Sequence, residues 1–154
     1  MSFDDYIAEL RSELAHHSDA VRERLLRFVA AIPPNARSSR FIVFTSQDAD
    51  GQFDVVGSVD GPDHFHINKA VQGVARIFDV VHSPDGFAPP VPTVDPFATD
   101  DCVNDVIIPC VADWLHDIWK TTPGIGAPVP IEIGGHDGIS VTQPTTIYEP
   151  KTSG

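Results

Sequence analysis

The sequence contains no apolar run long enough to cross a membrane and too few cysteines to build a disulfide framework. A membrane-spanning helix needs ~20 consecutive apolar residues, and every apolar run in this chain is far shorter. Residues 3–32 interleave acids with arginines and so lack the apolar core of a signal peptide. The two cysteines, Cys102 and Cys110, are expected to be reduced and mostly buried. These absences predict a cytoplasmic protein that does not bind a membrane.

Positive charge is also scarce after residue 40. Residues 1–40 hold six carboxylates and six arginines, whereas residues 41–150 hold sixteen carboxylates against Lys69, Arg76 and Lys120. Fourteen of the sixteen acids are aspartates, whose short side chains suit turns and helix starts. The net charge of −12 argues against binding to nucleic acid, because phosphates repel such a surface, and it favours a basic protein partner.

No catalytic or cofactor motif is found. The serines and threonines have no nucleophile-elbow motif, and the glycines at residues 124–126 lack the context of a phosphate-binding loop. Residues 48–54 have the aspartate spacing with which a calcium loop begins, but Val59 stands where such a loop requires a glutamate. A solvated turn is the better interpretation of that segment. We therefore expect no cofactor.

Length and composition indicate a single domain comprising residues 1–154. A chain of 154 residues can bury roughly 70% of the surface that its unfolded form exposes. Its 14 prolines and 11 glycines predict long ordered loops around that core.

The N-terminal part is predicted to be helical over residues 3–32. Its apolar residues recur at steps of three, four or seven, which is the helical period, and Pro33 and Pro34 end the pattern. A single helix of this length would measure about 45 Å, more than the width of a domain of this size. A break near residues 16–19 is therefore left open.

The middle of the chain is predicted to contain a hairpin followed by a helix. Residues 41–45 are apolar on both faces, as in a central strand, and residues 53–59 alternate, with an Asp and Gly turn between the two strands. We expect a short extended piece at residues 64–67, a helix capped by Asn68 and a short strand at residues 80–82.

The second half is predicted to contain a long loop, a helix and another hairpin. Residues 83–101 hold five prolines and form the loop. The helix is placed at Asn104 or Asp105, because this start puts Pro109 near the tolerated first turn. Residues 129–133 and 139–142 alternate and predict the second hairpin. The fold class is α+β, with a mainly antiparallel sheet built from two hairpins and covered on one face by three helical segments.

Four residues are weak candidates for a metal site. His64 and His66 lie two apart, so both imidazoles would face the same way on a strand, and His136 and Asp137 could join them from the glycine-rich turn. Such a site could activate water in a small hydrolase. Surface histidines that only titrate are the simpler interpretation.

Several segments resemble a family of small uncharacterised bacterial proteins. They are residues 60–63 with Asn68 and Lys69, residues 89–97, residues 103–106 with 111–114, and residues 136–138. The resemblance covers about two thirds of the chain and implies a shared fold, with no activity to carry over. As a small, acidic α+β domain without catalytic motifs, the chain is also similar to the immunity proteins that neutralise bacterial toxins. This similarity concerns the general class of protein only.

These observations favour a non-enzymatic, immunity-like protein whose aspartate-rich loops dock on a basic protein. A small metal-dependent hydrolase and a small-ligand binder with its pocket between sheet and helices stay open as alternatives, and so does the oligomeric state. The expected contacts lie in the turns and in the proline-rich loop, and they are Asp60, Asp63, Asp85, Asp95, Asp100, Asp101 and Asp137.

Overall fold

The computed structural model describes residues 3–46, 50–84, 86–92, 104–135 and 145–150. Within these residues the chain forms four helices, a five-stranded sheet and a separate two-stranded sheet. In chain order the elements are α1 (Phe3–His16), α2 (Ser18–Ala31), β1 (Ser38–Thr45), β2 (Phe53–Asp60), α3 (His64–Lys69), β3 (Arg76–Asp79), β4 (Val81–Ser83), β5 (Gly86–Ala88), α4 (Asn104–Lys120), β6 (Ile131–Gly135) and β7 (Thr145–Tyr148). None of the described helices has the length and hydropathy needed to cross a bilayer.

The main sheet has the strand order β3-β2-β1-β6-β7, so β1 is its central strand, as its apolar sequence predicts. β1 and β2 form the predicted antiparallel hairpin, in register from Ser38 opposite Asp60 to Thr45 opposite Phe53. β6 runs parallel to β1, while β3 and β7 pair antiparallel to their neighbours. The sheet is mixed and mostly antiparallel, which confirms the α+β class.

The second predicted hairpin is only partly matched. β6 and β7 (Thr145–Tyr148) are antiparallel neighbours, whereas the strand predicted at residues 139–142 lies outside the described residues. Gly134 and Gly135, expected in the turn, belong to β6. Residues 136–144 lie outside the described part of the chain, so the predicted turn there is untested.

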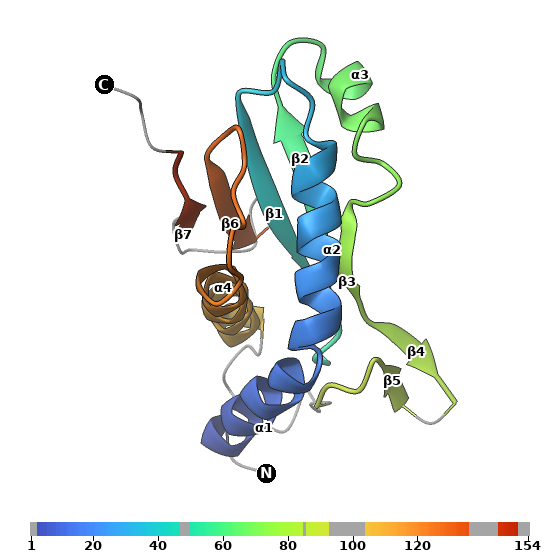
Figure 1. Ribbon diagram of the computed structural model, residues 1–154. Coiled ribbons are helices and arrows are strands. Elements are labelled where there is room, and N and C mark those ends of the chain that lie inside the picture. Colours follow the sequence, from blue (N-terminus) through green and yellow to red (C-terminus); the bar gives the residue numbers. More distant parts are fainter. Residues whose placement is uncertain (1–2, 47–49, 85, 93–103, 136–144, 151–154) are drawn as a thin grey trace.

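Helices α1, α2 and α4 lie on one side of the main sheet (Figure 1). The core between them contains the fully buried rings of Phe28, Phe41 and Phe53 together with Leu25. A Cβ atom on Gly57 of β2 would overlap the Phe28 ring, so the absence of a side chain lets α2 lie close to the sheet. The predicted helical cover of one face is therefore present, but two of its three helices come from the N-terminal segment, and the helix expected after Asn68 is not among them.

The N-terminal helical segment is interrupted at His17, within the range where a break was left open. His17 has φ −102° and ψ 5°, and its ring lies 5.5 Å from that of Phe78 on β3. Leu10 and Leu14 before the break and Val21 after it are all buried. The break turns the apolar stripe of the segment so that both halves reach the core.

The predictions for residues 64–78 are wrong. Residues 64–67 begin the short helix α3 and are not extended, and residues 76–79 form β3 where a helix was expected. The helix starts early because Asp63 is in the left-handed region (φ 53°) and its carboxylate accepts a hydrogen bond from the backbone N–H of His66. Asn68, expected to cap a helix, has another role.

Asn68 closes the edge of β2 beyond the end of β3. Its Oδ1 accepts a hydrogen bond from the backbone N–H of Val59, and its Nδ2 donates to the carbonyl of Val59, each at 2.9 Å. One side-chain amide thus takes the place of a neighbouring strand for one residue of β2.

The proline-rich segment is less irregular than predicted. The short strand expected at residues 80–82 is β4, and β5 pairs with it inside the segment predicted to be a loop. Residues 93–103 lie outside the described chain. α4 covers Asn104–Lys120, and Pro109 lies within it. Its predicted start is untested, because the residues directly before Asn104 are outside the described chain.

We predict that Asn68→Ala lowers the free energy of unfolding by about 1–3 kcal/mol, because both backbone groups of Val59 lose their partner at a half-buried edge. Chemical denaturation measures the change. Gln72→Ala, at an exposed position in the same segment, is the matched control and should be nearly neutral. Equal midpoints for the two variants would contradict this role of Asn68.

Candidate functional site

Two of the seven predicted partner-binding acids lie in the described part of the chain. Asp60 and Asp63 are both exposed and lie in the turn that joins β2 to α3. The other five, Asp85, Asp95, Asp100, Asp101 and Asp137, lie outside the described residues. The turn is therefore the one part of the proposed docking surface whose geometry can be examined.

The strand on which the metal prediction relied is absent. His64 and His66 are in α3, where positions two apart do not share a face of the helix. His136 and Asp137 lie outside the described residues. Over the described ranges, no group of three or more potential metal ligands is found.

We refer to residues 60–69 as the α3 tip. It projects beyond the end of the main sheet (Figure 1) and carries Phe65, whose surface is 76% exposed. The Nζ atom of Lys69 lies 4.9 Å from the centre of the Phe65 ring. On the other side of α3, Ile67 is only 3% exposed and anchors the helix to the core. The tip is a fixed helix turn that presents an aromatic ring to solvent.

A hollow of about 740 Å³ lies next to the α3 tip. Phe65 and Lys69 form one wall, and Val56 of β2 lies in its lining. Arg76 also lines it, and the guanidinium of Arg76 forms an ion pair with Asp79 at 3.0 Å. The hollow therefore combines apolar surface with cations that already have partners.

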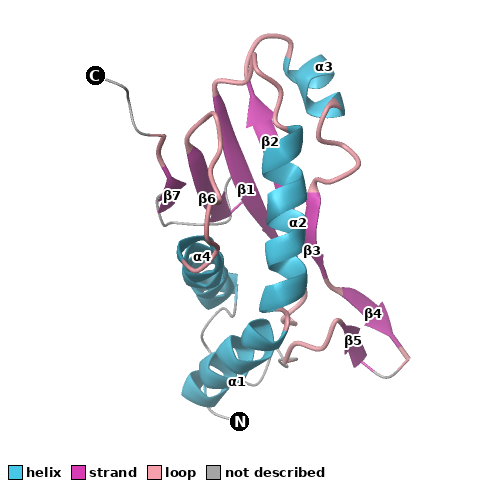
Figure 2. Ribbon diagram, viewed as in Figure 1, coloured by secondary structure: helices cyan, strands magenta, loops and turns pink. Residues whose placement is uncertain are grey.

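Val56 belongs to the face of the sheet opposite to α1, α2 and α4 (Figure 2), because it alternates along β2 with Gly57, which faces Phe28 of α2. Ile42 on β1 pairs with Val56 on β2, and both are half-buried, as is typical of a face without a covering layer. Phe44, two residues further along β1, is 39% exposed.

A pair of carboxyl groups lies on neighbouring strands of the same sheet. Asp54 on β2 is directly opposite Asp79 on β3. Burial raises the pKa of Asp54 to about 6, and its hydrogen bond and charge repulsion with Asp79 act in the same direction. The backbone N–H of Val80, 3.1 Å from Oδ1 of Asp54, opposes this shift in pKa.

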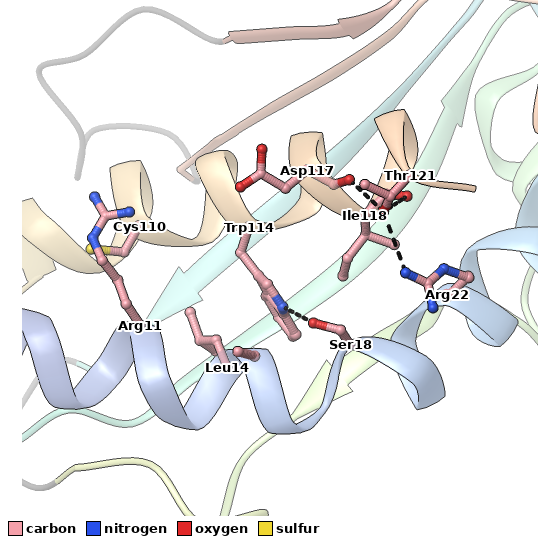
Figure 3. Close-up of a pocket in the computed structure, with 10 residues that line it drawn as sticks. Arg11, Leu14, Ser18, Arg22, Cys110, Trp114, Asp117, Ile118 and Thr121 are labelled. Carbon is pink, nitrogen blue, oxygen red and sulfur yellow. Dashed lines mark hydrogen bonds between the residues drawn. The ribbon is translucent and has the colours of Figure 1, made fainter. Parts of the chain in front are cut away.

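A second concavity, of about 230 Å³, lies where α1, α2 and α4 meet (Figure 3). Leu14, Trp114 and Ile118 supply apolar walls, and Arg11 and Arg22 lie at its two ends. We call this concavity the helix pocket. It lies between helices, not between sheet and helices as the small-ligand alternative expected.

Hydrogen bonds fix the walls of the helix pocket. Nε1 of Trp114 donates to Oγ of Ser18 at 3.0 Å. Arg22 donates through Nε to Oγ1 of Thr122 at 3.0 Å and through Nη2 to Oγ1 of Thr121 at 3.3 Å. These contacts tie the start of α2 to the end of α4.

The helix pocket was missed from sequence, although a signal for it exists. Arg11, Ser18 and Arg22 are spaced by seven and four residues, so they lie on one stripe beside the apolar one. Such a stripe is usually solvated surface, and only the position of α4 makes it the rim of a cavity. Trp114 and Trp119 of α4 are both buried, against Phe78 and Tyr148 respectively.

The arrangement defines an α+β domain with a five-stranded mixed sheet and helices on one face. The chain belongs to the family described as "Family of unknown function (DUF6389)", whose model matches residues 1–149. No curated protein and no solved structure matches the chain. The expected membership of an uncharacterised family is confirmed, while a bacterial source stays an expectation.

The carboxyl pair generates a pH-dependent prediction. Between pH 3.8 and about 6 the folded protein holds a proton on Asp54 that the unfolded chain releases, so stability falls as pH rises through this window. Asp54→Asn removes the charge and should raise the melting temperature at pH 7 more than at pH 4. At pH 7 the free energy of unfolding should rise by about 1 kcal/mol. The increase is no larger because solvent screens the charge of this partly exposed carboxyl group.

The control for this experiment is Glu149→Gln, which removes one charge from an exposed position near the C-terminal end of the described chain. It should leave the shape of the melting profile against pH unchanged. If both variants give the same profile from pH 4 to pH 7, the carboxyl pair does not store the proposed electrostatic repulsion.

Proposed function

We propose that this protein is a non-enzymatic, immunity-like binding domain that docks on a basic protein through the α3 tip. The contact is made by the ring of Phe65, with the carboxylates of Asp60 and Asp63 beside it. Binding covers a functional surface of the partner and so blocks it. The second candidate function is the binding of a small ligand in the helix pocket, which lies in a different part of the molecule.

The exposure of Phe65 is the observation that carries the proposal. Burying a phenylalanine side chain contributes about 1.5–3 kcal/mol, and 76% of this residue's surface is in contact with water. Aromatic side chains dominate the energetics of many protein interfaces. A large ring held outward by an anchored helix is therefore well suited to insert into a partner.

The rigidity of the tip supports the same conclusion. Ile67 is buried, and the amide of Asn68 is bonded to the backbone of β2. The ring of Phe65 also lies against the ammonium group of Lys69. Since these contacts fix the helix before a partner arrives, binding costs little conformational entropy.

Charge determines the kind of partner. The chain has a net charge of −12, and its long-range field attracts a basic protein and speeds its approach. Asp60, at the end of β2, and Asp63, the N-cap of α3, add two exposed carboxylates to the α3 tip that carries Phe65. Lys69 and Arg76 do not reverse this preference, because Arg76 is paired with Asp79 and the carboxylates of Asp60 and Asp63 outnumber the single ammonium group of Lys69.

The remaining acids extend the proposal on the basis of sequence alone. Asp85, Asp95, Asp100 and Asp101 belong to or border the proline-rich segment, and Asp137 follows β6. Aspartate in such segments suits exposed turns, where it would add to the attraction for a basic surface.

A peptide selection tests the proposal. The full chain is immobilised, and a displayed library of random peptides is selected against it at low salt. We predict that the selected peptides combine lysine or arginine with an apolar residue. Their affinity should fall about tenfold or more in Phe65→Ala, which corresponds to the loss of at least about 1.4 kcal/mol of binding energy.

Two further variants sharpen this test. Leu26→Ala removes a side chain from another exposed apolar residue, on α2, and should leave the affinity unchanged. Asparagine also adopts the left-handed conformation and can cap a helix, so Asp63→Asn removes only the charge. This variant should bind the peptides more weakly and with less dependence on salt concentration. Selected peptides that are acidic, or that bind Phe65→Ala as well as wild type, would refute the proposed docking surface.

A further inference from the structure

We infer that the protein forms a symmetric dimer through the face of the main sheet opposite to α1, α2 and α4, and that the partner at this face is a second copy of the chain. We call this surface the open face (Figure 2). Residues directly opposite one another on paired strands share a face, so the open face contains Arg40, Ile42 and Phe44 of β1, Val56 of β2, Arg76 of β3 and Glu132 of β6. The inference does not rest on the function proposed for the α3 tip.

The centre of the open face is an apolar strip. Ile42 and Val56 lie opposite each other on β1 and β2, and both are half-buried. Phe44 follows Ile42 on the same side of β1, with 39% of its surface exposed. Within the described ranges no helix lies over this strip. Covering it would remove apolar surface from water, which favours association.

The open face is less acidic than the chain as a whole. Two hollows border it, one of about 740 Å³ and one of about 350 Å³, and they are lined by three of the chain's ten lysines and arginines but only two of its 22 acids. Asp54 and Asp79, opposite each other on β2 and β3, bring the acids of this region to four. Two copies with a net charge of −12 repel each other, and this repulsion is smallest where the open faces meet.

Two ion pairs flank the apolar strip. Nη2 of Arg40 lies 4.0 Å from Oε2 of Glu132, on the side of the strip toward β6. Nη1 of Arg76 lies 3.0 Å from Oδ2 of Asp79, on the opposite side, at β3. All four side chains are between 38% and 70% exposed. A partner on the open face therefore meets both a cation and an anion on each side of the strip.

A two-fold axis parallel to the strands makes the open face complementary to itself. This axis reverses the strand order, so that β3 of each copy lies over β6 of the other, and β1 lies over β2. Ile42 of one copy then contacts Val56 of the other, and Arg76 approaches Glu132 of the other copy. Arg76 is level with Val56 and Glu132 with Arg40, an offset of two residues or about 7 Å. The ~30° rotation between packed sheets and the length of the arginine side chain can span this offset.

A second copy fits this pattern better than a partner with a strong charge of either sign. A basic protein would bring cations against Arg40 and Arg76, and an acidic protein would approach a chain with a net charge of −12. A second copy brings an apolar strip to the apolar strip, and it offers Glu132 to Arg76 on both sides. The carboxylate of Glu132 can accept hydrogen bonds from two guanidinium groups, so its contact with Arg40 can persist.

Analytical ultracentrifugation of the full chain at neutral pH tests the inference. We predict a reversible monomer–dimer equilibrium with a Kd on the order of 1–100 μM, because the apolar strip is small. Ile42→Asp places a charge at the centre of the contact and should abolish the dimer. Leu26→Asp, at an exposed apolar residue on α2, is the matched control and should dimerise like the wild type.

Two charge reversals test the symmetry and do not depend on the stability of Ile42→Asp. Arg76→Glu and Glu132→Lys each place like charges at both contacts between the copies, so each variant alone should dimerise at least about tenfold more weakly. A mixture of the two variants should recover a heterodimer, because the contacts between positions 76 and 132 are then attractive on both sides. This recovery would also show that both variants are folded.

Three results overturn the inference. The first is a wild-type protein that remains monomeric up to about 1 mM. The second is a dimer that neither Ile42→Asp nor the charge reversals weaken, since it would use another surface. The third is a mixture of Arg76→Glu and Glu132→Lys that stays monomeric while the wild type dimerises, since it would contradict the two-fold arrangement. None of these results bears on the α3 tip, which the peptide selection tests separately.

Discussion

The contact between α2 and the main sheet at Gly57 is the constraint on which the rest of the structure depends. The ring of Phe28 occupies the space that a side chain on Gly57 would need, so the helix lies directly against β2. This contact fixes which face of the sheet carries the helical layer. Among the described residues, no helix lies over the opposite face or over the α3 tip (Figure 2). The proposed functions follow from this division of the molecule into a covered side and an open side.

The two candidate sites use different kinds of recognition. The α3 tip offers a projecting ring and acidic side chains, which suits a macromolecule with a basic surface. The helix pocket is a smaller concavity between three helices, and its two arginines are paired with Asp113 and Asp19. They lie at different places in the fold, the first beyond the end of β2 and the second between α1, α2 and α4. A ligand in the helix pocket would leave Phe65 free to engage a partner.

The sequence predicted those parts of the fold that follow from local patterns. The helical repeat of residues 3–32, the apolar strand at residues 41–45 and a helix that contains Pro109 are all found. Residues 64–78 were misassigned because two features decide their structure: the left-handed conformation of Asp63, which is local, and the pairing of Asn68 with Val59, which is not. Neither has a periodic signature. The acidic turn could be identified from composition, whereas the exposure of Phe65 and the helix pocket depend on packing between distant segments.

Hydrogen–deuterium exchange on the complex with a selected basic peptide tests the central claim most directly. The account predicts that the peptide slows exchange in residues 60–69, where the α3 tip becomes covered, and leaves α1 and α4 unchanged. The free protein supplies the reference, and the Phe65→Ala variant with the same peptide should show no such protection. Protection confined to α1 and α4, or an α3 tip that exchanges equally fast with and without peptide, would contradict the proposed mode of binding.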